Sequence, residues 1–271
     1  EYNSIVKTSR YKFTEKETLL SGFPRHDHLL YLEKKIKTEK TLLIMPTWRK
    51  GLAGDIIGKG NQRLKSEKFY QSDYALAWKA LLHSQILKNI TEEYGYKVVF
   101  FPHVNMALYL DHFEVPDYIS IENHTENCSM QTLFASTAMM LTDYSSVAFE
   151  MAYLKKPIIY YQFDYDFVFG GGHLTSKGYF SYEKNGFGPV CYDEKSVLNH
   201  LEKTLKNHCQ SEPGYLKRIK ETFEFTDGKC CQRVYDAVCK LKVDTGEPFE
   251  KNLDLKIKSA QKVQLIRRQA V

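Results

Sequence analysis

Long apolar runs are absent from this sequence. Its apolar stretches, such as residues 97–101 and 157–161, have the length of a β-strand and fall far short of the roughly 18 residues that a membrane-spanning helix needs. Residues 1–12 are polar and lack the apolar core of a secretory signal peptide. We therefore expect a cytoplasmic protein, with a peripheral contact on the inner face of the cell membrane as a further expectation.

Cysteine pairs with metal-site spacing are also absent. The six cysteines include no Cys-x-x-Cys pair, and we expect reduced, structural thiols. The net charge of +5 suits phosphate-rich ligands or an anionic membrane surface. No dense Lys/Arg stripe with interleaved aromatic residues is present, which argues against nucleic acid as a partner. We expect no metal and no cofactor, so that any nucleotide would be a substrate.

Short apolar runs alternate with amphipathic ones from residue 40 onward. The apolar runs predict strands over 41–45, 97–101, 117–121, 138–141 and 157–161. Helical spacing of apolar residues predicts helices over 74–94, 130–136, 147–154, 197–207, 215–223 and 232–241. Uniformly apolar strands separated by helices indicate an α/β, Rossmann-like fold, with a parallel sheet covered by helices on both faces. We predict one domain at 40–241, an N-terminal segment or crossover linker at 1–39, and a basic tail or packing helix at 242–271.

Polar residues gather directly after the expected strands, where parallel sheets bind their ligands. The richest segment is Thr142-Asp143-Tyr144-Ser145-Ser146, which leads straight into the expected helix at 147–154. The backbone N–H groups of a first helical turn favour a phosphate, and two serine hydroxyls add donors without bulk. Asp, Ser and Thr are equally favoured as a plain helix N-cap, so both interpretations stay open.

Two further strand ends carry candidate phosphate ligands. His103 follows a proline after the 97–101 strand, and it can donate to a pyrophosphate oxygen as a leaving group gains charge. A loop histidine without such a role is the alternative. Arg49 follows the 41–45 strand in a Gly-rich loop, which suits either a bidentate phosphate clamp or a solvated basic turn. Residues 225–229, with Arg233 one turn later, are by themselves typical of a turn and a helix cap.

In order and spacing, these segments resemble the CDP-glycerol glycerophosphotransferases of teichoic-acid and capsule synthesis. The resemblance runs from Ser21 to Val238, about four-fifths of the chain, and its most specific element is Leu141–Tyr161, LTDYSSVAFEMAYLKKPIIYY. Further matches follow in the same order: Gly22–Asp27 (GFPRHD), Pro46–Arg49 (PTWR), the Pro-His turn at His103, Phe180–Val190, and Asp227-Gly228-Lys229 with Arg233-Val234.

This resemblance implies the C-terminal, donor-binding half of a two-domain GT-B-type glycosyltransferase. The implied enzyme moves glycerol phosphate, or a similar polyol phosphate, from a CDP-linked donor to a cell-surface polymer or lipid-linked acceptor. His103 would be catalytic and would lie on the donor phosphates. The other implied donor-site residues are Arg49, Thr142, Asp143, Ser145, Ser146, Glu150 and Arg233.

Roles within this set differ. The two serines would contact phosphate, whereas Arg49 and Arg233 would either bind phosphate or pack against the protein. Glu150 would reach a ribose hydroxyl, unless it is an ordinary carboxylate on a helix face.

Three departures from the family pattern leave the transferred unit open. The chain lacks the His-Gly-Thr-like turn that supplies the presumed catalytic base, so we expect the acceptor-binding half to lie upstream and this chain alone to bind a cytidine nucleotide without transferring anything. The segment Glu114–Asn127 carries extra polar residues, and Phe163–His173 contains three glycines, which suggests a mobile loop over the site.

Two alternatives therefore remain. One is a nucleotide-sugar glycosyltransferase for capsule polysaccharide, built on the same scaffold. The other is a non-catalytic module that binds a nucleotide or a polymer. A serine hydrolase is disfavoured because no Gly-x-Ser-x-Gly elbow accompanies Ser145 or Ser146.

Overall fold

The computed structural model describes residues 1–7, 11–58, 63–122, 129–172 and 177–241. The chain divides into two compact units, one of His28–Glu224 and one of Glu1–Asp27 together with the chain from Phe225 onward. The basic tail predicted at 242–271 lies outside the described residues. No helix in the described part of the chain is both long and apolar enough to cross a membrane.

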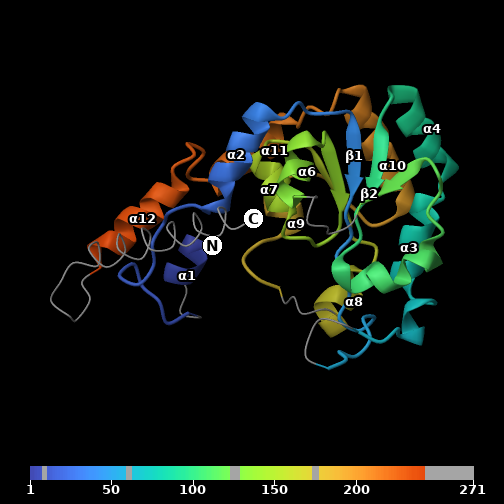
Figure 1. Cartoon of the computed structure of the whole chain (residues 1–271), viewed down its shortest axis with the longest axis horizontal. Coiled ribbons are helices and arrows are strands. Elements are labelled where there is room, and N and C mark those ends of the chain that lie inside the picture. The colour runs from blue at the N-terminus through green and yellow to red at the C-terminus, as the bar shows by residue number, and fades with distance from the viewer. Residues whose placement is uncertain (8–10, 59–62, 123–128, 173–176, 242–271) are drawn as a thin grey trace, which may run out of the picture. The chain divides into compact units, whose positions relative to one another are not determined.

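A single parallel sheet forms the centre of the larger unit (Figure 1). Its strands lie in the order β3-β2-β1-β4-β5-β6, the order of a doubly wound Rossmann-type sheet. Each neighbouring pair is parallel; for example, Leu43 of β1 lies opposite Val99 of β2 and Met140 of β4. The strand bounds are β1 Thr41–Ile44, β2 Lys97–Phe100, β3 Ile119–Ile121, β4 Met139–Thr142, β5 Ile158–Tyr161 and β6 Val190–Cys191. The predicted α/β fold with a parallel sheet is confirmed.

Both faces of the central strands are buried, which is why these strands are apolar throughout. All four residues of β1, β4 and β5 are buried. Because successive side chains point to opposite faces, Leu42 and Ile44 join one core cluster and Leu43 joins the other. Helices must therefore cover both faces.

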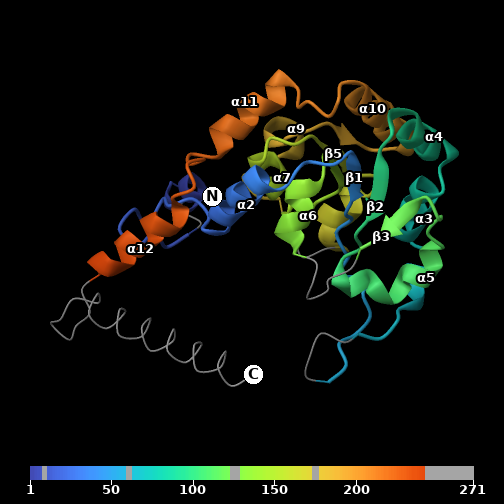
Figure 2. The same cartoon turned by 45° about the horizontal axis from the view of Figure 1, so that its top comes forward.

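Two groups of helices cover the two faces (Figures 1 and 2). The core that contains Leu42 also takes side chains from α3 (Asp73–Leu82), α4 (Gln85–Tyr94) and α10 (Glu194–Lys206). The core that contains Leu43 takes side chains from α2 (Arg25–Lys35), α6 (Met130–Ser136), α7 (Ala148–Tyr153) and α11 (Pro213–Thr222). In both views α6 and α7 lie on the opposite side of the sheet from α3 and α4.

The helix predicted at 74–94 is wrong as a single element, because it is two helices. The chain breaks at His83 and Ser84, and Ser84 takes extended backbone angles as the N-cap of α4. Apolar residues on both pieces feed the same core, so their spacing mimics one long helix. The sequence prediction also missed α2 and the short edge strand β6.

Short helical segments lie in the connections that follow the strands. After β1 comes the 3₁₀ turn η1 (Glu67–Phe69), and after β2 come η2 (Val104–Tyr109) and α5 (Leu110–Phe113). After β5 come α8 (Tyr165–Phe167) and the π-helical turn η3 (Val168–Gly172), and α9 (Tyr182–Asn185) precedes β6. These connections form the carboxyl edge of the sheet.

The smaller unit contains α1 (Tyr2–Val6) and α12 (Cys230–Lys240). The Asp27 carboxylate caps α12 by accepting the backbone N–H groups of Cys230 and Cys231 at 2.9 and 2.7 Å. Gly22 has a φ of +72°, and a Cβ there would lie 2.6 Å from the Cys230 sulfur. Glycine is therefore the residue that this turn requires.

Candidate functional site

The strand order makes the point between β1 and β4 a topological switch point. After β1 the chain continues to β2 and β3 on one side of the sheet, whereas β4 begins the series on the other side. The connection after β1 leads to α3 on one face, and the connection after β4 leads to α7 on the opposite face. Ligands of open α/β sheets bind at such a switch point, beyond the carboxyl ends of the strands.

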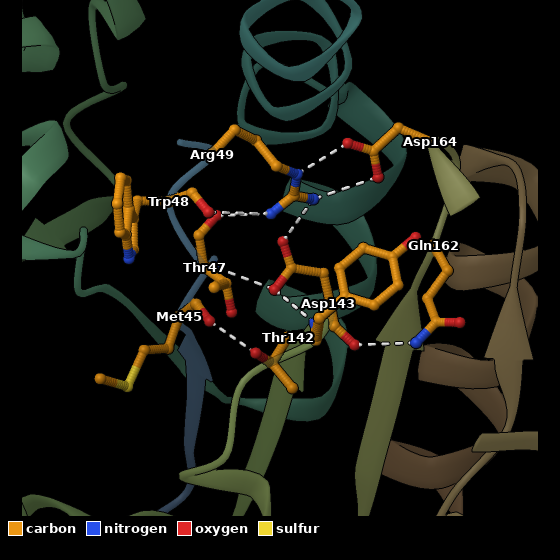
Figure 3. A network of polar contacts seen from close by, with 9 residues as sticks. Met45, Thr47, Trp48, Arg49, Thr142, Asp143, Gln162 and Asp164 are labelled. Carbon is orange, nitrogen blue, oxygen red and sulfur yellow. Dashed lines mark hydrogen bonds and ion pairs between the residues drawn. The ribbon is translucent and has the colours of Figure 1, made fainter. Parts of the chain in front are cut away.

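Two hydrogen bonds join the ends of β1 and β4 at this switch point (Figure 3). The Thr142 hydroxyl donates to the Met45 carbonyl at 2.6 Å. The Thr47 backbone N–H donates to Asp143 Oδ1 at 2.9 Å, and the same oxygen accepts the Tyr144 N–H at 2.6 Å. Thr142 and Asp143 are fully buried, so they lie beneath the surface at this switch point.

Arg49 is the central residue of this buried polar network, and Figure 3 shows its guanidinium between two carboxylates. Nη2 donates to Asp143 at 2.9 Å and to Asp164 at 3.1 Å, and Nε donates to Asp164 at 2.8 Å. Nη1 donates to the Thr47 carbonyl at 2.7 Å. One side chain therefore connects the loops that follow β1, β4 and β5.

The surroundings of Arg49 keep it charged. Burial alone would lower the pKa of its guanidinium, but Asp143 and Asp164 outweigh that effect and raise the pKa above its usual value. The rings of Tyr74 and Tyr144 lie 4.9 and 5.0 Å from the guanidinium carbon and add cation–π contacts.

This geometry does not agree with a phosphate clamp at Arg49. The side chain is fully buried, and protein acceptors take the donors of its planar fork. The packing alternative fits instead. The same holds for Thr142 and Asp143, whose polar atoms bond within the protein. These three residues connect the loops at the switch point, and direct donor contact by them stays a prediction that this arrangement disfavours.

The serine pair lies in the turn between β4 and α7. Ser145 is half-buried and Ser146 is exposed. The Val147 N–H donates to Ser145 Oγ at 3.4 Å, and the cap position of α7 is Val147, which makes no side-chain cap bond. Gln162, directly after β5, helps to hold the turn in place, because its side-chain amide donates to the Asp143 carbonyl at 3.0 Å. The pair is thus not a conventional N-cap of α7.

His103 lies at the end of β2, where it is the N-cap of η2. Its Nδ1 accepts the Asn105 N–H at 3.1 Å, so a neutral imidazole there carries its proton on Nε2. The ring stacks on Trp48 at 5.9 Å between centroids and 27° between planes. This stacking packs the end of β2 against the loop after β1. The neutral His103 ring carries its N–H donor there on Nε2.

Glu150 and Arg233 lie in different surroundings. Glu150 is only 6% exposed within α7. Arg233 belongs to the smaller unit, where it pairs with both oxygens of Asp227 and lies 3.6 Å above the Phe225 ring. Donor contact by either residue stays a prediction.

Sequence reasoning assigned no site role to Asp164, Gln162 or Trp48, although all three follow expected strands. Asp164 and Asp166 have the Asp-x-Asp spacing of many metal-dependent transferases, and this spacing was the available signal. The structure separates the two, because Asp164 is buried against Arg49 and Asp166 is exposed. Among the described residues, no group of three or more His, Cys, Asp and Glu side chains could hold a metal ion.

Comparisons with known proteins point to one family. The sequence model of the CDP-Glycerol:Poly(glycerophosphate) glycerophosphotransferase family matches residues 1–240. The minor teichoic acid biosynthesis protein GgaB of Bacillus subtilis is 38% identical over 241 residues, which are 89% of this chain and 25% of GgaB. A teichoic acid poly(glycerol phosphate) polymerase of Bacillus spizizenii is 25% identical, over 78% of this chain and 50% of the polymerase.

Among solved structures, the wall teichoic acid polymerase TagF shares the fold with a TM-score of 0.55 at 19% identity. The match covers 84% of this chain and 53% of the TagF chain. This chain thus spans a quarter to about half of the length of these relatives. With a family match along almost its whole described length, the chain belongs to the CDP-glycerol:poly(glycerophosphate) glycerophosphotransferases.

Proposed function

We propose that this chain is the donor-binding domain of a transferase that moves glycerol phosphate, or a similar polyol phosphate, from a CDP-linked donor to a cell-surface polymer or lipid-linked acceptor. Family membership supports the reaction class. The Bacillus spizizenii relative is named for a poly(glycerol phosphate) product, and a TagF variant has been solved after soaking with CDPG.

One observation carries the assignment of the donor to this domain. The serine turn follows β4 and the His103–Trp48 stack joins the ends of β2 and β1, so both lie at the carboxyl edge of the sheet near its switch point. Two adjacent serine hydroxyls at such a strand-to-helix turn suit the diphosphate of a nucleotide. The buried Arg49 network beneath them keeps the loops in place before the nucleotide binds.

The proposed reaction is an in-line displacement at the phosphorus that carries the polyol. The acceptor oxygen forms a new P–O bond, the bond from that phosphorus to the bridging oxygen breaks, and CMP leaves with the electron pair. His103 Nε2–H donates to the phosphate oxygens as negative charge develops on the leaving group. The general base that takes the acceptor proton belongs, in this proposal, to the part of the longer protein that this chain does not span.

Calorimetry with CDP, cytidine, UDP and GDP tests donor binding. We expect CDP to bind more tightly than UDP or GDP, and a Ser145→Ala, Ser146→Ala double variant to weaken CDP binding more than cytidine binding, because only the phosphates meet the turn. Equal losses for CDP and cytidine would show that the turn has no phosphate role. Preference for UDP or GDP would instead support a nucleotide-sugar glycosyltransferase, and turnover of CDP-glycerol by the intact protein tests the reaction itself.

A further inference from the structure

The segment Asp164–Gly172, which includes α8 and η3, is attached at both ends to the loop after β1. At its start, Asp164 binds the Arg49 guanidinium through both carboxylate oxygens at 2.8 and 3.1 Å. At its end, the Gly172 carbonyl accepts the Gly51 N–H at 3.4 Å. A Cβ at position 172 would lie 2.3 Å from the Phe167 ring, so the glycine lets this ring pack against the end of the segment.

The same segment also contacts the residue that precedes the two serines. The Phe169 ring meets the Tyr144 ring edge-on at 5.7 Å between centroids. The Arg49 guanidinium carbon also lies 5.0 Å from the centroid of this Tyr144 ring. Tyr144 is adjacent in sequence to Ser145, so its position restricts the backbone of the serine turn.

Two chains of side-chain contacts therefore connect Asp164 to the serine turn. The first passes through Arg49 to the Asp143 carboxylate, which is the other partner of the guanidinium. The second passes through Phe169 to the Tyr144 ring. Bidentate ion pairs are directional as well as strong, so a buried pair of this kind holds both loops in a defined orientation.

We propose that Asp164 is a positioning residue for donor binding, which orients the Ser145–Ser146 turn through Arg49 and Phe169 without touching the donor. The inference rests on the proposed function, because it takes the serine turn as the diphosphate site. Donors held in place before the ligand arrives lose little freedom on binding, so loosening them lowers affinity for the group they contact.

The test compares Asp164→Asn with Asp166→Asn in the intact protein. Asp166 lies two residues further along in α8 and is exposed, so its variant makes the same change in charge outside the network. Calorimetry measures CDP and cytidine with each variant. We expect Asp164→Asn to weaken CDP binding about tenfold, equivalent to about 1.4 kcal/mol, with cytidine changed by less than about twofold. Asp166→Asn should change neither affinity by more than about twofold.

A purely structural role gives a different result. If folded Asp164→Asn binds CDP as wild type does, or loses CDP and cytidine affinity equally, the positioning role is overturned. If this variant does not fold, Phe169→Leu measures the same ratio, because it removes the ring against Tyr144 without exposing a buried charge.

The controls also separate this inference from the proposed function. Wild-type protein that prefers UDP or GDP contradicts the CDP assignment, and the ratio is then measured with that diphosphate and its nucleoside. Wild-type protein that binds no nucleotide overturns both proposals.

Discussion

Replacing Arg49 by Met is the sharpest test of the buried network. The change removes the one guanidinium shared by Asp143 and Asp164. Asp143 keeps the backbone N–H groups of Thr47 and Tyr144, whereas Asp164 loses both bonds to the guanidinium. The cost therefore arises mainly at Asp164, a carboxylate that is itself buried.

Breaking a buried ion pair by removing one partner costs about 3–5 kcal/mol, because the remaining charge stays buried. Met keeps an unbranched apolar side chain in this fully buried position, so lost packing adds little. We expect Arg49→Met to lower the free energy of unfolding by about 3–5 kcal/mol. Adding Asp164→Asn removes the buried charge and should recover about half of the loss.

Urea denaturation followed by circular dichroism measures these free energies. A cost below about 1 kcal/mol, or a double variant no more stable than the single one, would refute the reasoning.

Three further predictions concern single positions. His103→Ala should lower transfer by the intact protein by about 2–4 kcal/mol in transition-state terms, and His103→Asn should do the same although it keeps a cap acceptor; activity within a few-fold of wild type would exclude the role. Gly188→Ala should lower the free energy of unfolding by about 1–3 kcal/mol or more, because its Cβ would lie 1.7 Å from a β5 carbonyl oxygen. The control Gly178→Ala has open space around its Cβ and should change the free energy of unfolding by less than about 0.5 kcal/mol in the same urea titration. Burial lowers the pKa of Lys156 to about 8 from its ordinary 10.5, so the charged amine costs stability below about pH 8. The free energy of unfolding of wild type should therefore rise relative to that of Lys156→Met between about pH 8 and pH 10.5. A difference that stays flat or falls over this range would contradict the sign.

Much of the fold could be predicted from the sequence because buried parallel strands have a local signature. The apolar runs within 41–45, 97–101, 138–141 and 157–161 each form a strand, because the strand interiors are covered on both faces of the sheet. Helix boundaries were less predictable. The break at Ser84 changes which direction the chain takes but not which residues are buried, so apolar periodicity does not reveal it.

The candidate site also contains residues that local sequence could locate and residues whose role it could not predict. Residues directly after buried strands must lie at the carboxyl edge, so the serine turn and His103 could be located from local pattern alone. The family resemblance likewise depends on contiguous segments such as Leu141–Tyr161.

Only the tertiary structure decided what Arg49 does. Its partners Asp143 and Asp164 lie 94 and 115 positions further along the chain, and they meet it because β4 and β5 follow β1 in the order of the sheet. A guanidinium after a strand is chemically suited to a phosphate or to a carboxylate, and local sequence cannot distinguish the two. The choice depends on which loops the strand order brings together, and that order follows from packing over the whole chain.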